Sequence, residues 1–330
     1  MDLPWNNQEK EQPVEKPAAP EPEKKNSPLI ISQSLIKKVI DKHGNDIPLC
    51  PHQLYKNYLA QDKIKPLATL PMKYGNYGET LILGATAKDE EISLPTLNNG
   101  KKPVDQIRIE QQALEYFPRH AMELGISVIK NTNVQIPIYK QYGGIIIRGV
   151  VDLFPTPIIG PNGYELAVID IKFTGDVNNT HGDFCWGNPQ WLDHIQADLY
   201  QWILADIDVD LCKKMDPEFD VKVGYDSIFT PYIINLLKQK AFSFYYLVMG
   251  YQKSNLKEQF IKIKKEFFGR PDYVFLEKEL LERIRKTIAR LAMLNQQGWK
   301  PEPEYNRCKN CSVSKLAGGT CIYYTNTRVV

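Results

Sequence analysis

Three consecutive runs rich in β-branched residues constrain the fold of this chain more than any other feature. They are VIKNTNVQIPIYK at 128–140, GGIIIRGVVDLF at 143–154 and YELAVIDIKF at 164–173. Short runs of this kind, separated by Gly, Asn and Pro, are typical of neighbouring strands in one sheet. AFSFYYLVMGYQ at 241–252 predicts a further strand. Residues 126–252 are therefore expected to form a core with a small mixed β-sheet.

Helical patterns lie on both sides of this core in the sequence. The stretches with helical spacing or start signals are 32–42, 50–61, 73–84, 105–124, 190–206 and 275–297. In the last of them we expect Glu279 to pair with Arg283, and Glu282 with Lys286, on the face opposite an apolar stripe. The sequence thus predicts an α/β fold, with a helical segment at 29–125 before the core and another at 253–330 after it.

The bulk properties limit the class of protein without fixing its function. Residues 1–28 hold six prolines among Glu, Lys and Ala, which predicts a disordered tail that is a tether, a partner-binding peptide or a plain solvated extension. No apolar run approaches the roughly 20 residues of a membrane helix, and the first residues lack the pattern of a secretion signal. We therefore expect an intracellular, cytoplasmic protein without a membrane partner. A net charge of +2 permits a nucleic-acid surface but does not demand one.

Charged residues interrupt two of the predicted strands. Asp152 lies in GVVDLF, and Asp170 and Lys172 lie in AVIDIKF. Carboxylates within such apolar runs are costly unless a metal ion or another partner compensates them. Side chains alternate along a strand, so Asp170 and Lys172 share one face, and a hairpin from Phe154 to Glu165 could bring Asp152 beside them.

These residues provide the ligands for a hydrolytic metal site. Two carboxylates and the backbone carbonyl of Ile171 are the hard oxygen ligands that Mg²⁺ or Mn²⁺ prefers. Such an ion polarises a phosphodiester and activates water, while Lys172 positions that water or stabilises negative charge. The alternative is that Asp170 and Lys172 merely end a strand at its solvent edge, because a bare D-x-K triplet is common.

Further residues with the same order along the chain carry a resemblance to a known family. Gly78-Glu79 in YGNYGETL precedes the strands, and Gln196 and Tyr200 in HIQADLYQW follow them, four residues apart on one helix face. With GVVD and VIDIK, this arrangement resembles the RecB-like branch of the PD-(D/E)XK nucleases, including the iron-sulfur exonucleases of CRISPR adaptation. The resemblance implies a restriction-endonuclease-like core in which Glu79 completes the metal shell. It also implies that Gln196 and Tyr200 orient the lysine, the water or the DNA; ordinary helix packing is the alternative for these two.

Three cysteines near the end of the chain predict a second metal site. Cys308, Cys311 and Cys321 need one more ligand, and Cys50 is the best candidate. Thiolates at such a site favour zinc or an iron-sulfur cluster, and the spacing does not choose between them. The resembling nucleases hold a 4Fe-4S cluster that joins the two ends of the chain, although the gap before Cys321 is longer here. We expect that cluster, with structural Zn²⁺ as the alternative.

Four aromatic residues and one lysine-rich segment are candidates for contacts with nucleic acid. The aromatic residues are Trp186, Trp191, Tyr74 and Tyr77, which either stack on bases or belong to the core. The segment 253–270 contains Lys257, Lys262, Lys264, Lys265 and Arg270, which either bind phosphates or form a solvated charged face. Cys185, Cys212, His181 and His194 are not expected to be metal ligands, and Cys212 is placed in a loop.

Taken together, these features predict a metal-dependent DNA nuclease, and the resemblance implies an exonuclease. DNA that is single-stranded or has free ends is the expected partner, and recombination, repair and phage DNA metabolism are all compatible pathways. The sequence has no P-loop, so a helicase or recombination partner would be a separate chain. The rival hypothesis is a catalytically inactive nucleic-acid-binding or assembly protein with this fold and a structural metal site. Oligomeric state and strand preference are left open.

Overall fold

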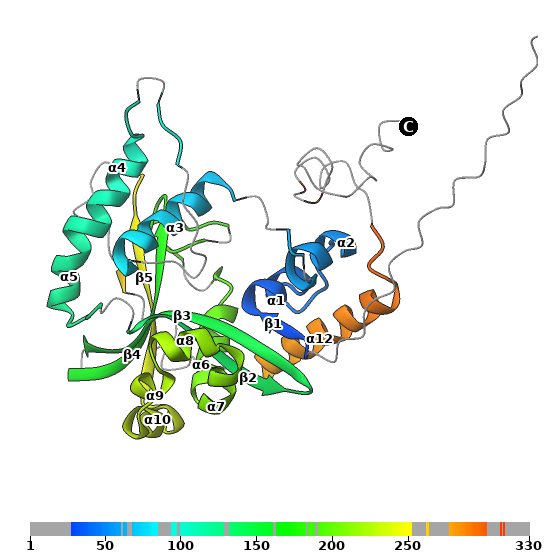
Figure 1. Cartoon of the computed structure of the whole chain (residues 1–330). Coiled ribbons are helices and arrows are strands. Elements are labelled where there is room, and N and C mark those ends of the chain that lie inside the picture. The colour runs from blue at the N-terminus through cyan, green and yellow to red at the C-terminus, as the bar shows by residue number, and fades with distance from the viewer. Residues whose placement is uncertain are drawn as a thin grey trace, which may run out of the picture.

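A mixed β-sheet forms the centre of the molecule (Figure 1). The computed structural model describes residues 28–60, 62–64, 68–84, 94–97, 100–128, 132–160, 163–182, 184–188, 191–252, 262–263, 277–301, 311 and 313. The six strands are β1 (Ile30–Ser32), β2 (Val134–Tyr142), β3 (Ile145–Gly160), β4 (Gly163–Thr174), β5 (Phe242–Gly250) and β6 (Lys262–Ile263). They follow the order β1-β3-β4-β5-β6, and β2 pairs with β3 outside that path. The predicted α/β class, with a mixed sheet flanked by helices, is confirmed.

Strand β3 connects the two halves of the sheet. Its first half pairs antiparallel with β2, and Ile146–Arg148 also pairs in parallel with β1. Its second half pairs antiparallel with β4, after a register shift between Leu153 and Thr156. Irregularities of this kind bend a strand and redirect its side chains. Asp152 lies directly before the shift, where the chain passes from one half of the sheet to the other.

The hairpin prediction is confirmed, whereas the predictions for two flanking segments need correction. The hairpin predicted from Phe154 to Glu165 is formed, and its turn lies between Gly160 and Gly163. The segment 29–125, interpreted as helical, also contributes β1, whose three residues are too few to show a strand period. Strand β6 likewise lies in the segment 253–330 that was interpreted as helical. The lysine-rich stretch around it and the tail at 1–27 lie outside the described residues.

Alternation along β4 and β5 separates two hydrophobic layers. Ala167, Ile169 and Ile171 pack in one cluster with residues of helices α3 (Leu70–Leu83) and α5 (Phe117–Glu123). Val168 belongs to the other cluster, together with residues of α6 (Ile195–Leu204). Asp170 and Lys172 have the same parity as Val168 and so face the α6 side. The strand period therefore directs the two charged residues toward one helix.

Helices cover both faces of the sheet. Because β4 and β5 are parallel, a crossover must join them, and it consists of α6, α7 (Val209–Met215), α8 (Pro217–Lys222), α9 (Tyr225–Ile228) and α10 (Pro231–Lys238). Helices α3, α4 (Val104–Gln111) and α5 lie on the opposite side in Figure 1. A π-helix, η2 (Gln112–Tyr116), joins α4 to α5, and Pro118 lies in the first turn of α5, where its missing N–H costs little. Cys212 was predicted in a loop, but it is buried on α7.

The long helix α12 (Glu277–Gln296) packs beside the N-terminal elements α1 (Gln33–Val39) and α2 (Pro51–Leu54) (Figure 1). Its predicted Glu279–Arg283 surface pair is wrong: Arg283 is buried and instead forms two hydrogen bonds to Asp193, at 2.7 and 2.8 Å. Lys286 bonds the carbonyl of Gly44 at 2.9 Å rather than the predicted Glu282. Buried charges need such partners, and the helical period alone does not reveal them. No helix in the described part of the chain is long and apolar enough to cross a membrane.

Candidate active site

Asp170 and Lys172 form the centre of the candidate active site on β4. Asp170 is 1% exposed, and its Oδ2 forms an ion pair with the ammonium of Lys172. The same ammonium lies 3.4 Å from the carbonyl oxygen of Ile171. Lys172 therefore occupies the space between two of the oxygen atoms that the sequence predicts as metal ligands, and serves there as their counter-cation.

Asp152 joins this pair from β3. Its Oδ2 accepts a hydrogen bond from the backbone N–H of Ile171 at 2.7 Å, and its Oδ1 accepts one from the amide of Gln135 at 2.7 Å. The bond to Ile171 lies between strand positions of Asp170 and Lys172, so it fixes the second carboxylate beside the first. The predicted convergence of the three charged residues is seen in the structure.

Helix α6 supplies the two predicted polar residues. Gln196 is buried and donates to Asp170 Oδ1 at 2.6 Å, while the hydroxyl of Tyr200 lies 3.4 Å from both the Gln196 amide and the backbone nitrogen of Val150. A Cβ at Gly149 would lie 2.7 Å from the Tyr200 ring, so this close approach requires glycine. Gln196 and Tyr200 thus contact the site itself and not only the helix packing.

Glu79 approaches from the opposite layer, on α3. A Cβ at Gly78 would lie 2.4 Å from the ring of Phe173, so glycine lets α3 pack closely against the end of β4. Glu79 is half-buried, and its charge acts on both Asp152 and Lys172. The two residues of the Gly78-Glu79 motif therefore act differently. Gly78 allows α3 to pack closely against β4, and Glu79 adds a third acidic side chain near Asp152 and Asp170.

The carboxylates of the site repel one another in a dry environment. Burial, followed by the charges of Asp170 and Glu79, raises the pKa of Asp152 well above its ordinary value. Burial also raises the pKa of Asp170, and the opposing effect of Lys172 does not cancel it. Burial lowers the pKa of Lys172, but the surrounding carboxylates outweigh it and the net shift is upward. The cluster thus has more negative charge than its one lysine neutralises.

This donor set fits a divalent ion with oxygen ligands. The protein offers Asp152, Asp170 and the Ile171 carbonyl, with the charge of Glu79 nearby. Among the described residues, no three His, Cys, Asp or Glu side chains converge closely enough to bind a metal by themselves. Mg²⁺ commonly uses one or two carboxylates and fills its other positions with water and substrate phosphate. The arrangement therefore suits an open site and not a closed structural one.

Two residues near the site have no signal in the sequence. Gln135 adopts a left-handed backbone, with φ of 51°, and reaches Asp152 from β2. Lys37 is half-buried on α1; burial lowers its pKa, and the charges of Asp193, Lys172, Arg283 and Asp170 act on its ammonium. Gln135 lies in a run that predicts only a strand, and Lys37 in a run that predicts only a helix. Their approach to the site depends on the packing of β2 and α1.

The cysteine and aromatic predictions are only partly described. Cys50 is half-buried at the start of α2 and Cys311 is buried, whereas Cys308 and Cys321 lie outside the described residues. Trp186 and Tyr74 are buried and pack edge-on against Tyr246 and Tyr251, so the core interpretation holds for both. The hydroxyl of Tyr77 donates to Glu110 at 2.5 Å. Trp191 is 57% exposed. Cys185 is fully buried.

Comparison with known proteins gives a distant likeness among solved structures. No protein-family model matches the sequence, and no curated protein is significantly similar to it. Among solved structures, the chain is similar to a Eubacterium rectale crystal structure named "Putative exonuclease". The two share 14% sequence identity with a TM-score of 0.46, over 91% of this chain and 88% of the other.

Proposed function

We propose that this chain is a metal-dependent DNA nuclease of the PD-(D/E)XK class, RecB-like branch, which hydrolyses phosphodiester bonds as an exonuclease. The observation that carries the proposal is the cluster of the buried Asp152 and Asp170 with the half-buried Lys172, in which both carboxylates have raised pKa values. Such a cluster costs folding free energy and is expected where a cation and an anionic substrate bind. Recombination, repair and phage DNA metabolism would each use this reaction.

The roles of the residues follow from their contacts. Asp152, Asp170, Glu79 and the Ile171 carbonyl would hold Mg²⁺ or Mn²⁺, which when bound polarises the phosphodiester and lowers the pKa of water. Gln196 fixes the orientation of Asp170 through its 2.6 Å hydrogen bond, and Tyr200 connects Gln196 to β3. Lys172 keeps its proton because of its raised pKa, so it acts as a cation toward phosphate oxygens and not as a base.

A cleavage assay tests this proposal. Linear and circular DNA, single- and double-stranded and carrying an internal label, is incubated with the parent chain in Mg²⁺, Mn²⁺ or EDTA, and with Lys172→Met. We expect metal-dependent release of nucleotides from linear DNA, no cleavage of circles, and loss of activity in the variant. Cleavage of circles would retain the nuclease and reject the exonuclease. If folded parent protein binds DNA and cuts none of the substrates, the rival binding or assembly function replaces the proposal.

We propose in addition that Cys50, Cys308, Cys311 and Cys321 hold a 4Fe-4S cluster, with structural Zn²⁺ as the alternative. The aromatic ring of Tyr55, which follows α2, stacks on Trp299, which follows α12, with ring centroids 5.4 Å apart. This contact brings the chain after Cys50 beside the chain that leads to the other three cysteines. Iron, sulfide and zinc analysis of purified protein separates the two metals, and Cys50→Ser is expected to lower the bound metal.

A further inference from the structure

The connection between β4 and α6 carries two tryptophans with opposite environments. Trp186 is 3% exposed and packs on Tyr246 of β5, with ring centroids 5.1 Å apart. Trp191 is 57% exposed and lies just before α6. The same connection joins Lys172 to Gln196, so an exposed aromatic ring lies between two elements of the candidate active site.

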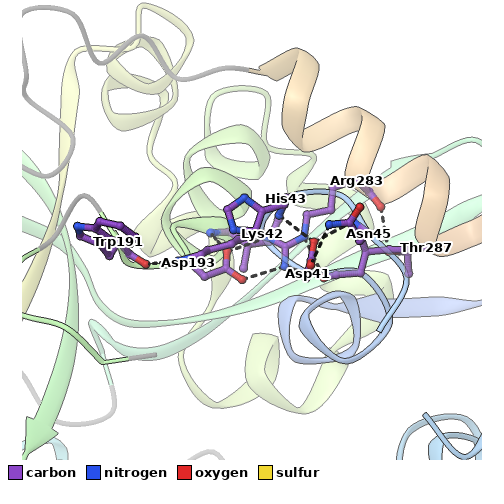
Figure 2. Close-up of polar contacts among 10 residues, drawn as sticks. Asp41, Lys42, His43, Asn45, Trp191, Asp193, Arg283 and Thr287 are labelled. Atoms are coloured by element: carbon purple, nitrogen blue, oxygen red, sulfur yellow. Dashed lines mark hydrogen bonds and ion pairs between the residues drawn. The ribbon is translucent and has the colours of Figure 1, made fainter. Parts of the chain in front are cut away.

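A structured turn contacts Trp191 through Lys42 (Figure 2). The ammonium of Lys42 donates to the carbonyl oxygen of Trp191 at 2.7 Å and lies 5.8 Å from the ring centroid. Lys42 belongs to a turn in which Asp41 Oδ1 accepts from the backbone nitrogens of His43 and Asn45, each at 2.8 Å. Within the described chain Lys42 makes no salt bridge, so two of its three N–H donors are available to a ligand.

Trp191 and Lys42 both line a hollow of about 590 Å³. The other described residues around it are Thr180, His181, Gly182 and Asn188, and none of them is acidic. A hollow of several hundred Å³ accommodates a small organic ligand such as a nucleotide. A cation, hydroxyl and amide groups and an exposed indole are the groups that bind a phosphate and an unpaired base.

A second hollow, of about 750 Å³, adjoins the first. It shares Trp191 and Lys42 with the first and is also lined by Asp193 and Asp198. Lys278, Arg283 and Lys286 line it as well, so cations and carboxylates both face this space.

From this arrangement we infer that Trp191 and Lys42 form a binding site for one unpaired nucleotide of single-stranded DNA, with the base on the indole and the adjacent phosphate on the ammonium. The inference rests on the proposed nuclease function and specifies its substrate as a single strand. An unpaired base is required because the bases of a duplex stack on one another and cannot cover the indole.

A binding assay without cleavage tests the site. The non-cleaving Asp170→Asn chain serves as background, and fluorescence anisotropy measures its affinity for a labelled single strand and for a blunt duplex. Adding Trp191→Ala should weaken single-strand binding by about 5- to 150-fold, the effect of losing one base–aromatic stack. Trp191→Phe should recover most of that loss, and duplex binding should be unchanged. Tyr232→Ala, which removes a ring that is 69% exposed on α10, is the matched control and should change neither.

Abasic oligonucleotides separate stacking from a merely structural effect. In the Asp170→Asn chain, which retains Trp191, removing the base at one position of the strand should weaken binding of that strand. When Trp191→Ala is added to that chain, removing the same base should weaken binding no further, because the aromatic partner of the base is already absent. Lys42→Gln should reduce the dependence of log affinity on log salt by about 0.7, as expected for one phosphate contact on a single strand.

The outcomes distinguish this inference from the proposed function. Equal single-strand affinity with and without Trp191, or an equal loss for duplex and abasic strands, overturns the nucleotide site even if the parent hydrolyses DNA. Tighter binding of single-stranded RNA than of DNA, lost in Trp191→Ala, overturns the assignment to DNA. If the parent chain does not hydrolyse DNA but the abasic pattern appears, the nuclease proposal fails and the nucleotide site stands.

Discussion

Asp170 is buried and Asp193 is half-buried, and the two aspartates have opposite surroundings. Asp193 accepts two hydrogen bonds from the guanidinium of Arg283, and these bonds outweigh burial and lower its pKa. Asp170 is paired with Lys172, but burial prevails and its pKa is raised. Both carboxylates lie beside a cation, so the presence of an ion pair does not distinguish a structural site from a functional one.

The difference lies in how completely each charge is balanced. Arg283 also donates to the carbonyl of Ile40, at 2.8 and 3.2 Å, so the Asp193 cluster joins α6, α12 and the chain after α1. In the other cluster Asp152 and Glu79 add negative charge that Lys172 does not balance. A balanced pair holds helices together, whereas an unbalanced cluster attracts a further cation.

The largest expected effect is on the rate of hydrolysis, which should depend on Asp170 but not on Asp193. Asp170→Asn removes a charged metal ligand, so hydrolysis by the folded protein should fall by about 10²–10³-fold or more. Asp193→Asn should change the rate per folded molecule less than about 3-fold, since Asp193 contacts Arg283 and not the site. Initial rates on a labelled strand in Mg²⁺ measure both. Similar losses in the two variants would remove the distinction.

The next largest effect is on stability, and it is expected at the Arg283–Asp193 pair and not at Asp170. Arg283→Met leaves the half-buried Asp193 without its partner and the carbonyl of Ile40 without its donor, which should cost about 1–3 kcal/mol of unfolding free energy. Urea denaturation of the parent and the variant measures this loss. Adding Asp193→Leu should restore part of it, because the uncompensated charge is then gone; no recovery would mean that Arg283 stabilises the fold by packing alone.

A smaller catalytic effect is expected at Gln135, which donates a hydrogen bond to Asp152. Gln135→Ala removes the 2.7 Å bond that orients the carboxylate, and should reduce metal affinity or hydrolysis by about 10–100-fold. Raising the Mn²⁺ concentration should restore much of the rate, which a loss of folding would not allow. Gln141→Ala, also on β2, is the control, and an equal loss there would contradict a specific role for Gln135.

The smallest expected effect is a gain in stability when the carboxylate of Asp152 is removed. Without added divalent metal near neutral pH, Asp152→Asn should raise the free energy of unfolding by about 1–2 kcal/mol while hydrolysis is lost. The pKa of Asp152 is raised in the folded state, so its ionisation costs stability as pH rises through that pKa and costs nothing below the ordinary value. The gain should therefore shrink toward acidic pH. Thermal unfolding across pH measures it, and a constant gain would contradict this origin.

Asp193 should show the reverse pH dependence. Its folded pKa is lowered, so its contribution to stability is present above the ordinary aspartate value and is lost as pH falls through the lowered one. The stability difference between the parent and Asp193→Asn should thus be largest near neutral pH and vanish in acid. The two aspartate variants together test whether burial or pairing dominates in each cluster, and parallel profiles would show that one effect dominates both.

The sequence predicted the strands and the charged centre because both depend on local pattern. Alternation along AVIDIKF places Asp170 and Lys172 on one face, and spacing of four places Gln196 and Tyr200 on one helix face. These regularities persist in any packing of the elements. The structure confirms that the four residues meet, with Gln196 bonded to Asp170 at 2.6 Å.

The remaining contacts depend on tertiary packing that no local pattern contains. Arg283 has the spacing of a surface residue on α12, yet it is buried because α1 and α6 both cover it. Gln135 reaches Asp152 only through its left-handed backbone on β2. Trp186 and Trp191 lie in one connection with the same composition around them, and only the path of that connection makes one buried and the other exposed.

Binding of Mn²⁺ tests the central claim most directly, because it requires neither a chosen DNA substrate nor turnover. Electron paramagnetic resonance of free Mn²⁺ gives the affinity of the parent, Asp170→Asn and Asp193→Asn in one titration series. The parent should bind the ion, Asp170→Asn should bind it at least about 10–100-fold more weakly, and Asp193→Asn should match the parent. Equal binding by the parent and Asp170→Asn would contradict the assignment of the β3–β4 cluster as the metal site.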